Sequence, residues 1–189
     1  MFASKNMLLS SGVPTQGSLT WATNYGDTTT IASSTIVTAT TTPVNSNGFG
    51  YFSSVLPPNA DIYFDVVLAS GASDSPVSVN FLGVSNTVSQ FNYNVPANYV
   101  AWYYSGAWFG NGTKYVDPPT FLNAGTYRIA ISKSNNILYM KSNSNSTVAS
   151  AQLPSGSSLY LCVLPQSGFR TSGATISGGL WYTGSGGLY

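Results

Sequence analysis

One stretch of this chain gathers side chains that could bind a ligand. Between Tyr99 and Asp117 the sequence YVAWYYSGAWFGNGTKYVD combines aromatic rings with amides, hydroxyls, a lysine and a carboxylate. Such mixtures bind sugars, because aromatic faces pack against the C–H side of a sugar ring while polar groups fix its hydroxyls. The residues that are candidates for binding a glycan are Trp102, Tyr104, Trp108, Asn111, Tyr115 and Asp117. Two other interpretations stay open, since alternating aromatics also pack in cores and line subunit interfaces.

Catalysis has few residues to draw on. The sequence contains no His and no Glu, which excludes a Ser–His–Asp triad and removes the commonest general acids and bases. Asp61 and Asp65 are four residues apart, which in a strand separates them by about 13 Å, too far to share a proton. The sequence therefore predicts a protein that is not an enzyme.

Neither a cofactor nor a metal is expected. A zinc site needs His or Cys ligands, and the only cysteine is Cys162. Because apolar residues flank it, Cys162 is interpreted as a small buried residue. A calcium site built from Asp and Asn oxygens near Asp27 or Asp117 stays open, although no spaced acidic loop is present.

The charge pattern limits the partners. Charged residues make up 6% of the chain and the net charge is +1. Six scattered cations cannot form a nucleic-acid-binding stripe, whereas low self-repulsion favours association between copies. The apolar stretch Met7-Leu8-Leu9 is too short for a signal peptide or a membrane span, so we expect neither secretion nor membrane insertion.

Short apolar segments are interrupted about every ten residues by Gly, Pro, Asn or Ser, which predicts an all-β fold. We expect an antiparallel two-sheet β-sandwich of jelly-roll or concanavalin-like type. The predicted strands cover residues 30–39, 50–56, 62–68, 77–84, 99–104, 126–133, 137–141, 159–164 and 174–176. In the clearest hairpin, at 126–141, the turn is Ser134-Asn135-Asn136, and Arg128 is predicted to face solvent.

Extended arms are predicted at both ends of the sandwich. The expected organisation is an N-terminal arm at 1–17, the β-sandwich at 18–176 and a C-terminal arm at 177–189 that is rich in glycine and aromatics. The C-terminal arm should dock on its own domain or on a neighbouring copy. Its interface candidates are Trp181, Tyr182 and Tyr189.

Two parts of the sequence resemble a known class of proteins. The opening Ala3-Ser4-Lys5-Asn6 with Leu8-Leu9-Ser10-Ser11-Gly12 resembles the start of bacteriophage tail-fibre and other virion-associated proteins. The stretch from about Phe49 to Gly168 resembles the SPRY-like branch of concanavalin-type sandwiches found in such proteins. The quoted elements are Gly50-Tyr51-Phe52, Phe81-Leu82-Gly83-Val84, and the hairpin Gly125-Thr126-Tyr127-Arg128-Ile129-Ala130-Ile131-Ser132 with Ile137-Leu138-Tyr139-Met140. The sequence departs from the family at Lys133, where an acidic residue is usual.

The resemblance implies a structural protein of a phage virion, surface-exposed and used for host attachment or decoration. The resemblance does not identify a partner; taken with the low charge and the aromatic stretch, the protein's expected partners are copies of itself and other virion proteins, with a host-surface glycan as a further candidate. Its implied location is the virion, after assembly in the host cytoplasm. The alternative is a jelly-roll protein of the capsid shell or its vertex (penton).

Overall fold

The apolar segments of this chain are rich in β-branched and aromatic residues, which favour strands over helices. The computed structural model describes residues 14–25, 29–33, 36–39, 50–68, 79–88, 99–103, 107–110, 113–116, 124–142, 148–165, 174–176 and 179–189. Within these ranges the chain forms sixteen strands and no α-helix. No helix long and apolar enough to cross a bilayer occurs among them.

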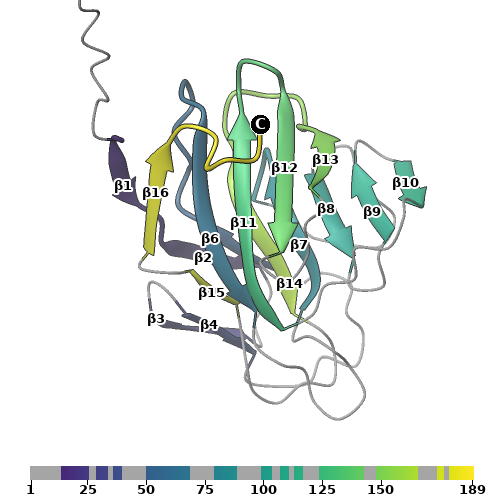
Figure 1. The fold of residues 1–189 in the computed structure, drawn as a ribbon. Coiled ribbons are helices and arrows are strands. Elements are labelled where there is room, and N and C mark those ends of the chain that lie inside the picture. Colours follow the sequence, from purple (N-terminus) through teal and green to yellow (C-terminus); the bar gives the residue numbers. More distant parts are fainter. Residues whose placement is uncertain are drawn as a thin grey trace, which may run out of the picture.

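The strands form two sheets (Figure 1). In the nine-stranded sheet the order is β13 (Ala149–Gln152), β12 (Ile137–Ser142), β11 (Gly125–Ser132), β6 (Ile62–Leu68), β15 (Ala174–Ile176), β4 (Ile36–Ala39) and β3 (Thr29–Ser33), while β16 (Leu180–Thr183) pairs with β6 and with β1 (Gln16–Ser18). In the seven-stranded sheet the order is β10 (Thr113–Val116), β9 (Ala107–Gly110), β8 (Tyr99–Tyr103), β7 (Val79–Ser85), β14 (Tyr160–Pro165), β5 (Gly50–Ser53) and β2 (Trp21–Tyr25). The strand pairs are antiparallel.

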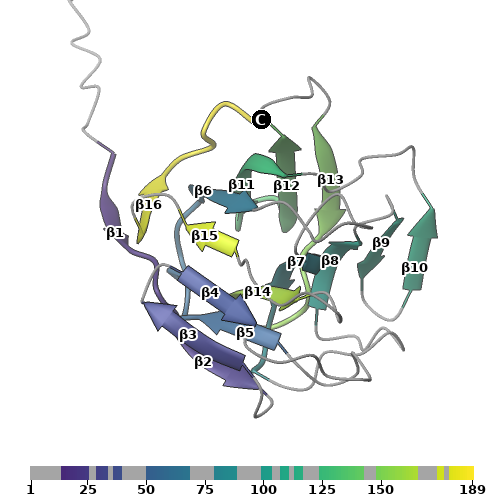
Figure 2. The ribbon, with the colours of Figure 1, turned by 90° about the horizontal axis from the view of Figure 1, so that it is seen from below.

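The two sheets stack as layers, with β6, β11 and β12 in one and β5, β14 and β7 in the other (Figure 2). Strand β6 shows how the sequence achieves this, because its side chains alternate strictly between buried and half-buried. Phe64 and Val66 point into the core, whereas Tyr63 and Asp65 point outward. The core also contains Trp102 of β8, which is 2% exposed.

These observations confirm the predicted all-β, two-sheet sandwich. The segment 62–68 forms β6 with the predicted bounds, and the predicted hairpin forms β11 and β12, with Ile131 opposite Leu138. The segment 30–39 was predicted to be a single strand, but the structure contains two strands there. They form the antiparallel pair β3 and β4, in which the backbone register places Ile31 opposite Val37.

The C-terminal arm lies on its own domain. Strand β16 adds to the first sheet beside β6, and Trp181 packs against the core and against the backbone of Gly17. Residues Gly184–Tyr189, here called the C-terminal strap, then cross the outer face in front of β6 and β11 (Figure 1, yellow). Residues 1–13 of the predicted N-terminal arm lie outside the described part, and β1 pairs with β16.

Candidate ligand site at the loop end of the sandwich

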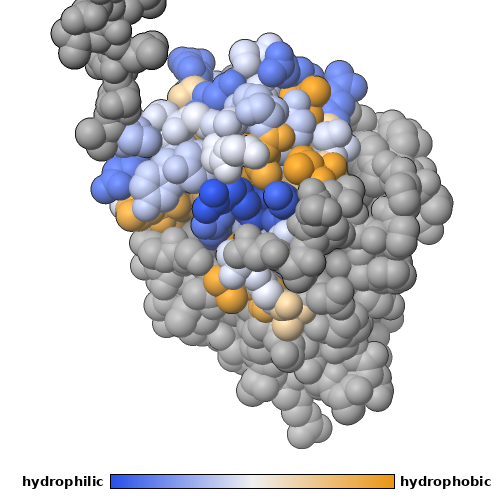
Figure 3. Space-filling model, viewed as in Figure 1, coloured by the Kyte–Doolittle hydropathy of each residue, from blue (hydrophilic) through white to orange (hydrophobic). Residues whose placement is uncertain are grey.

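Three connections meet at one end of the sandwich, the upper end in Figure 1, and enclose a hollow of about 520 Å³. They are the loop between β5 and β6, the turn between β11 and β12, and the loop between β13 and β14. The lining residues of this loop-end hollow are Pro58, Asn59, Asp61, Lys133, Ser134, Asn136, Leu153, Pro154, Gly156 and Ser157. Figure 3 shows that mostly hydrophilic and neutral residues gather at this end, above β11 and β12.

The carboxylate of Asp61 joins these elements. Its Oδ1 accepts hydrogen bonds from the backbone N–H groups of Lys133 (2.7 Å) and Ser134 (3.2 Å). Its Oδ2 accepts from the hydroxyls of Ser132 (3.2 Å), Ser134 (3.0 Å) and Tyr189 (2.9 Å). A carboxylate has about four lone-pair positions, so five donors leave no free acceptor for a ligand. Asp61 therefore holds the turn and the C-terminal strap in place.

The pKa of Asp61 reflects these contacts. Partial burial alone would raise the pKa of the carboxyl, but hydrogen bonds from Ser134, Tyr189 and Lys133 more than offset it, and the net effect lowers the pKa below 3.8. The Tyr189 hydroxyl shows the reciprocal effect, because burial and the Asp61 carboxylate raise its pKa. Asp61 is therefore ionised at neutral pH and unsuited to donate a proton there.

Backbone contacts fix the other two connections. Asn136 has a φ of 58°, a left-handed conformation that Asn tolerates better than most residues, and its carbonyl accepts from Leu153 N–H at 3.0 Å. This bond ties the β11–β12 turn to the β13–β14 loop. On the other side of that loop, the Asn86 amide donates to the carbonyl of Ser155. The rim of the hollow is thus held at several points.

The groups left to face a ligand are amides, a hydroxyl and a cation. Asn59, Asn136 and Ser157 are exposed, and Lys133 is half-buried. Burial lowers the pKa of Lys133, and within the described part of the chain its ammonium forms no ion pair that would offset this shift. No cluster of three or more His, Cys, Asp or Glu occurs in the described part, and Asp27 and Asp117, the positions considered for a calcium site, lie outside it.

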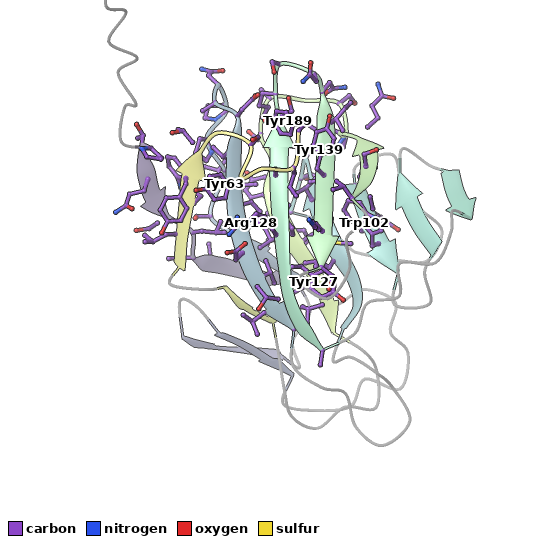
Figure 4. All side chains as sticks on the ribbon, in the orientation of Figure 1. Tyr63, Trp102, Tyr127, Arg128, Tyr139 and Tyr189 are labelled. Atoms are coloured by element: carbon purple, nitrogen blue, oxygen red, sulfur yellow. The ribbon has the colours of Figure 1, made fainter. Side chains whose placement is uncertain are left out.

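The outer face below the hollow is occupied by a second cluster (Figure 4). Arg128 donates from Nε and Nη2 to the two carboxylate oxygens of Asp65, each at 2.9 Å, and its guanidinium lies 5.2 Å from the ring centre of Tyr63. Arg128 faces outward as predicted, with its side chain 39% exposed, and it is ion-paired there. Its Nη1 donates to the carbonyl of Gly186 at 3.2 Å, so the C-terminal strap covers this cluster.

The three interface candidates of the C-terminal arm have partners within the chain. Tyr182 stacks on Tyr63 at 5.4 Å, and Tyr189 stacks on Tyr139 at 4.8 Å. Trp181 packs against the core. Each of the three therefore has a contact within the molecule, while Tyr189 remains 45% exposed and Trp181 and Tyr182 are half-buried.

Of the predicted glycan-binding residues, Trp102 is the one whose side chain the structure describes, and it does not line the loop-end hollow. Trp102 lies in the core, which fits the packing interpretation of the aromatic stretch. The strand register places Trp108 opposite Trp102 and Tyr115 opposite Trp108, while the side chains of Trp108 and Tyr115 are outside the described part. The other three candidates, Tyr104, Asn111 and Asp117, lie wholly outside it. Cys162 is fully buried, as predicted, and burial raises the pKa of its thiol well above the usual value.

The sequence predicted the turn Ser134-Asn135-Asn136 and a connection between the strands at 50–56 and 62–68, but not that these segments meet. Asp61 lies 73 residues from Ser134, and nothing in this spacing announces that they touch. The contact follows from the antiparallel pairing of β6, which begins after Asp61, with β11, which ends before Lys133. This pairing brings both residues to the same end of the sheet.

Comparisons with known proteins bear on the fold. No protein-family model matches the sequence, and no curated protein sequence matches it. Among solved structures, the chain is similar to the SPRY domain of human HERC1, with a TM-score of 0.59, 14% identity, and 86% of this chain and 96% of that chain covered. It is similar to the TRIM65 PSpry domain, with a TM-score of 0.60, 10% identity, and 89% and 90% covered.

A plant protein shows the same architecture. The Lotus tetragonolobus seed lectin aligns with a TM-score of 0.51 and 10% identity, with 90% of this chain and 96% of that chain covered. At sequence identities this low, the structural similarity establishes the fold alone. The function has to be argued from the site. The chain thus has the antiparallel two-sheet β-sandwich fold that is shared by SPRY domains and a seed lectin.

Proposed function

We propose that this protein is a binding module that holds a saccharide in the loop-end hollow. The observation that carries the proposal is the hollow itself, about 520 Å³ and bounded by three mutually anchored connections. Small-molecule sites typically measure about 300–1,000 Å³. The HERC1 and TRIM65 domains and the seed lectin have the same sandwich, which is compatible with a binding role.

The lining suits a sugar. Asn59 and Asn136 each offer an amide donor and an acceptor, and Ser157 adds a hydroxyl, which match the paired donors and acceptors of vicinal sugar hydroxyls. The exposed ring of Pro58 supplies apolar surface for the C–H face of a sugar ring. Because the connections are already fixed, a ligand would bind without first ordering them, which reduces the entropy cost of binding.

A binding role rather than a catalytic one is part of the proposal. The Asp61 carboxylate in the hollow is saturated by five donors and has a lowered pKa. Asp65, the next carboxylate along the chain, is engaged by Arg128. Neither is arranged like the acid and base pair that glycoside hydrolysis uses.

The proposed place of action is the surface of a phage particle, in host attachment or decoration. The support is the resemblance of the opening residues to tail-fibre proteins together with the low charge of the chain. Neutral hydrogen bonds are little affected by salt, which suits a particle that meets varied ionic conditions. Mass spectrometry of purified virions should find the chain. Its absence from homogeneous particles would contradict this location.

A saccharide array with the full chain tests the binding role. Asn136→Gly removes the amide and keeps a residue that tolerates the positive φ, and Asn59→Ala removes the second amide. Each should weaken binding by about tenfold, the usual size of a lost hydrogen bond, with the melting temperature little changed. The matched control is Thr126→Ala, on the same sheet but outside the hollow. Equal binding by all variants, or no bound saccharide, would contradict the proposal.

A further inference from the structure

We propose that the saccharide in the loop-end hollow carries an anionic group that pairs with the ammonium of Lys133. This inference rests on the proposed function and narrows its ligand class. The inference starts from the two charged residues that line the hollow, Asp61 and Lys133, and from the groups that interact with the charge of each.

The two charges differ in how they are satisfied. The negative charge of Asp61 is spread over two backbone N–H groups and three hydroxyls. Lys133 contributes one of those N–H groups, but its side chain takes no part. Among the described residues no ion pair reaches Lys133, whereas Arg128 is paired with Asp65. The hollow therefore contains a carboxylate whose acceptor positions are filled by hydrogen bonds and an ammonium group that has no ion-pair partner among the described residues.

Burial makes the unpaired cation significant. Lys133 is half-buried, and the loss of water around its ammonium lowers its pKa. An incoming carboxylate or sulfate would replace the lost hydration and favour the charged form, so binding an anion should raise that pKa. A neutral sugar would leave the cation uncompensated.

The surrounding lining favours an acidic sugar over an acidic peptide. The amides of Asn59 and Asn136 and the hydroxyl of Ser157 match sugar hydroxyls beside the charged group. An extended peptide would engage a strand edge through its backbone, whereas this hollow is bounded by loops and a turn. The hydrogen-bonding groups and the cation thus fit one compact ring that bears an anion.

The test is an array of sialylated, uronic-acid-containing and sulfated glycans, each printed beside its neutral parent, followed by titration of the strongest binder. Lys133→Met removes the charge and keeps the apolar stem, and Lys133→Arg keeps the charge. Lys141→Met is the matched control, because Lys141 is a half-buried lysine of β12 outside the hollow.

The intact chain should prefer the anionic member of a pair by about tenfold. Lys133→Met should abolish that preference, and Lys133→Arg and Lys141→Met should retain it. The carboxylated and sulfated arms identify which anion is bound.

Three results would overturn the inference, and they separate it from the proposed function. Equal binding of acidic and neutral glycans, still lost in Asn136→Gly, would leave the saccharide site standing without the charge. An unchanged preference in Lys133→Met would assign it to another residue. If no glycan binds but a tetra-aspartate peptide does so through Lys133, the ligand is a peptide and both proposals are wrong.

Discussion

At the scale of single residues, Asp61 has the most far-reaching contacts of the charged side chains described. One carboxylate connects the start of β6, the β11–β12 turn and the end of the C-terminal strap. Hydrogen bonds to a charged acceptor are stronger than neutral ones, so this group can fix loop geometry that weak turn contacts alone would leave loose. Its role is to position the rim of the hollow.

The lowered pKa of Asp61 predicts a specific pH dependence of stability. A carboxyl with a folded pKa below its unfolded value stabilises the fold fully above the unfolded pKa, and this contribution is lost as the pH falls through the folded pKa. Asp61→Asn should therefore melt below the parent at pH 5–8, and the gap should narrow below about pH 4. Melting temperatures measured from pH 2 to 8 test this. A gap that stays constant across the range would contradict it.

With no His in the chain, the parent itself should show little change between pH 5 and pH 8. A steep shift in that window that is lost in Asp61→Asn would contradict the lowered pKa of Asp61.

The core position of Trp102 predicts the outcome of its removal. Trp102→Ala should lower the free energy of unfolding by about 3–5 kcal/mol, because it opens a cavity between the sheets. Trp102→Phe should cost less, since a ring still fills part of the space. Denaturant unfolding measures both. A loss of saccharide binding at unchanged stability would instead make Trp102 a ligand contact.

At the scale of elements, the C-terminal strap depends on a close approach at Gly186. Its φ is +59°, and a Cβ there would lie 2.7 Å from Cγ of Tyr63, closer than side-chain carbons normally approach. The absence of a side chain lets the strap lie on the Tyr63 ring, where its carbonyl accepts from Arg128. The strap also brings Tyr189 to Asp61 and Tyr139.

Gly186→Ala should release the strap, and Gly187→Ala is the matched control. Both glycines have a positive φ, but a Cβ at Gly187 meets nothing within 4 Å. Both variants should therefore carry a similar backbone cost of about 1 kcal/mol, and only Gly186→Ala adds the clash with Tyr63. Hydrogen exchange of residues 184–189 and of the β11–β12 turn should increase in Gly186→Ala alone. Equal exchange in the two variants would show that the close approach does not hold the strap.

At the scale of the whole molecule, the parts predicted from sequence are those whose local signal is strong. Segment 62–68 alternates cleanly and hairpin 126–141 has Asn in its turn, and both form as expected. The strands that were not predicted are short or weakly apolar, such as QGS in β1 and ASAQ in β13. Such segments become strands because a neighbour offers hydrogen-bonding partners, which is a tertiary effect.

The sequence indicated some of the segments that form the candidate site, but not that they come together. The aromatic stretch suggested a ligand site because its composition is conspicuous, yet Trp102 is used for packing. The loop-end hollow consists of common polar and proline residues from three distant segments, and only the strand order brings them together. Composition alone could not distinguish these two places.

The central claim is that a saccharide binds at the loop end, and a titration followed by backbone amide chemical shifts tests it most directly. The ligand is the strongest binder from the array, added to the full chain. Shift changes should concentrate at residues 58–61, 133–136 and 153–157 and saturate with one site. Changes concentrated at residues 99–117, or none at all, would contradict the claim.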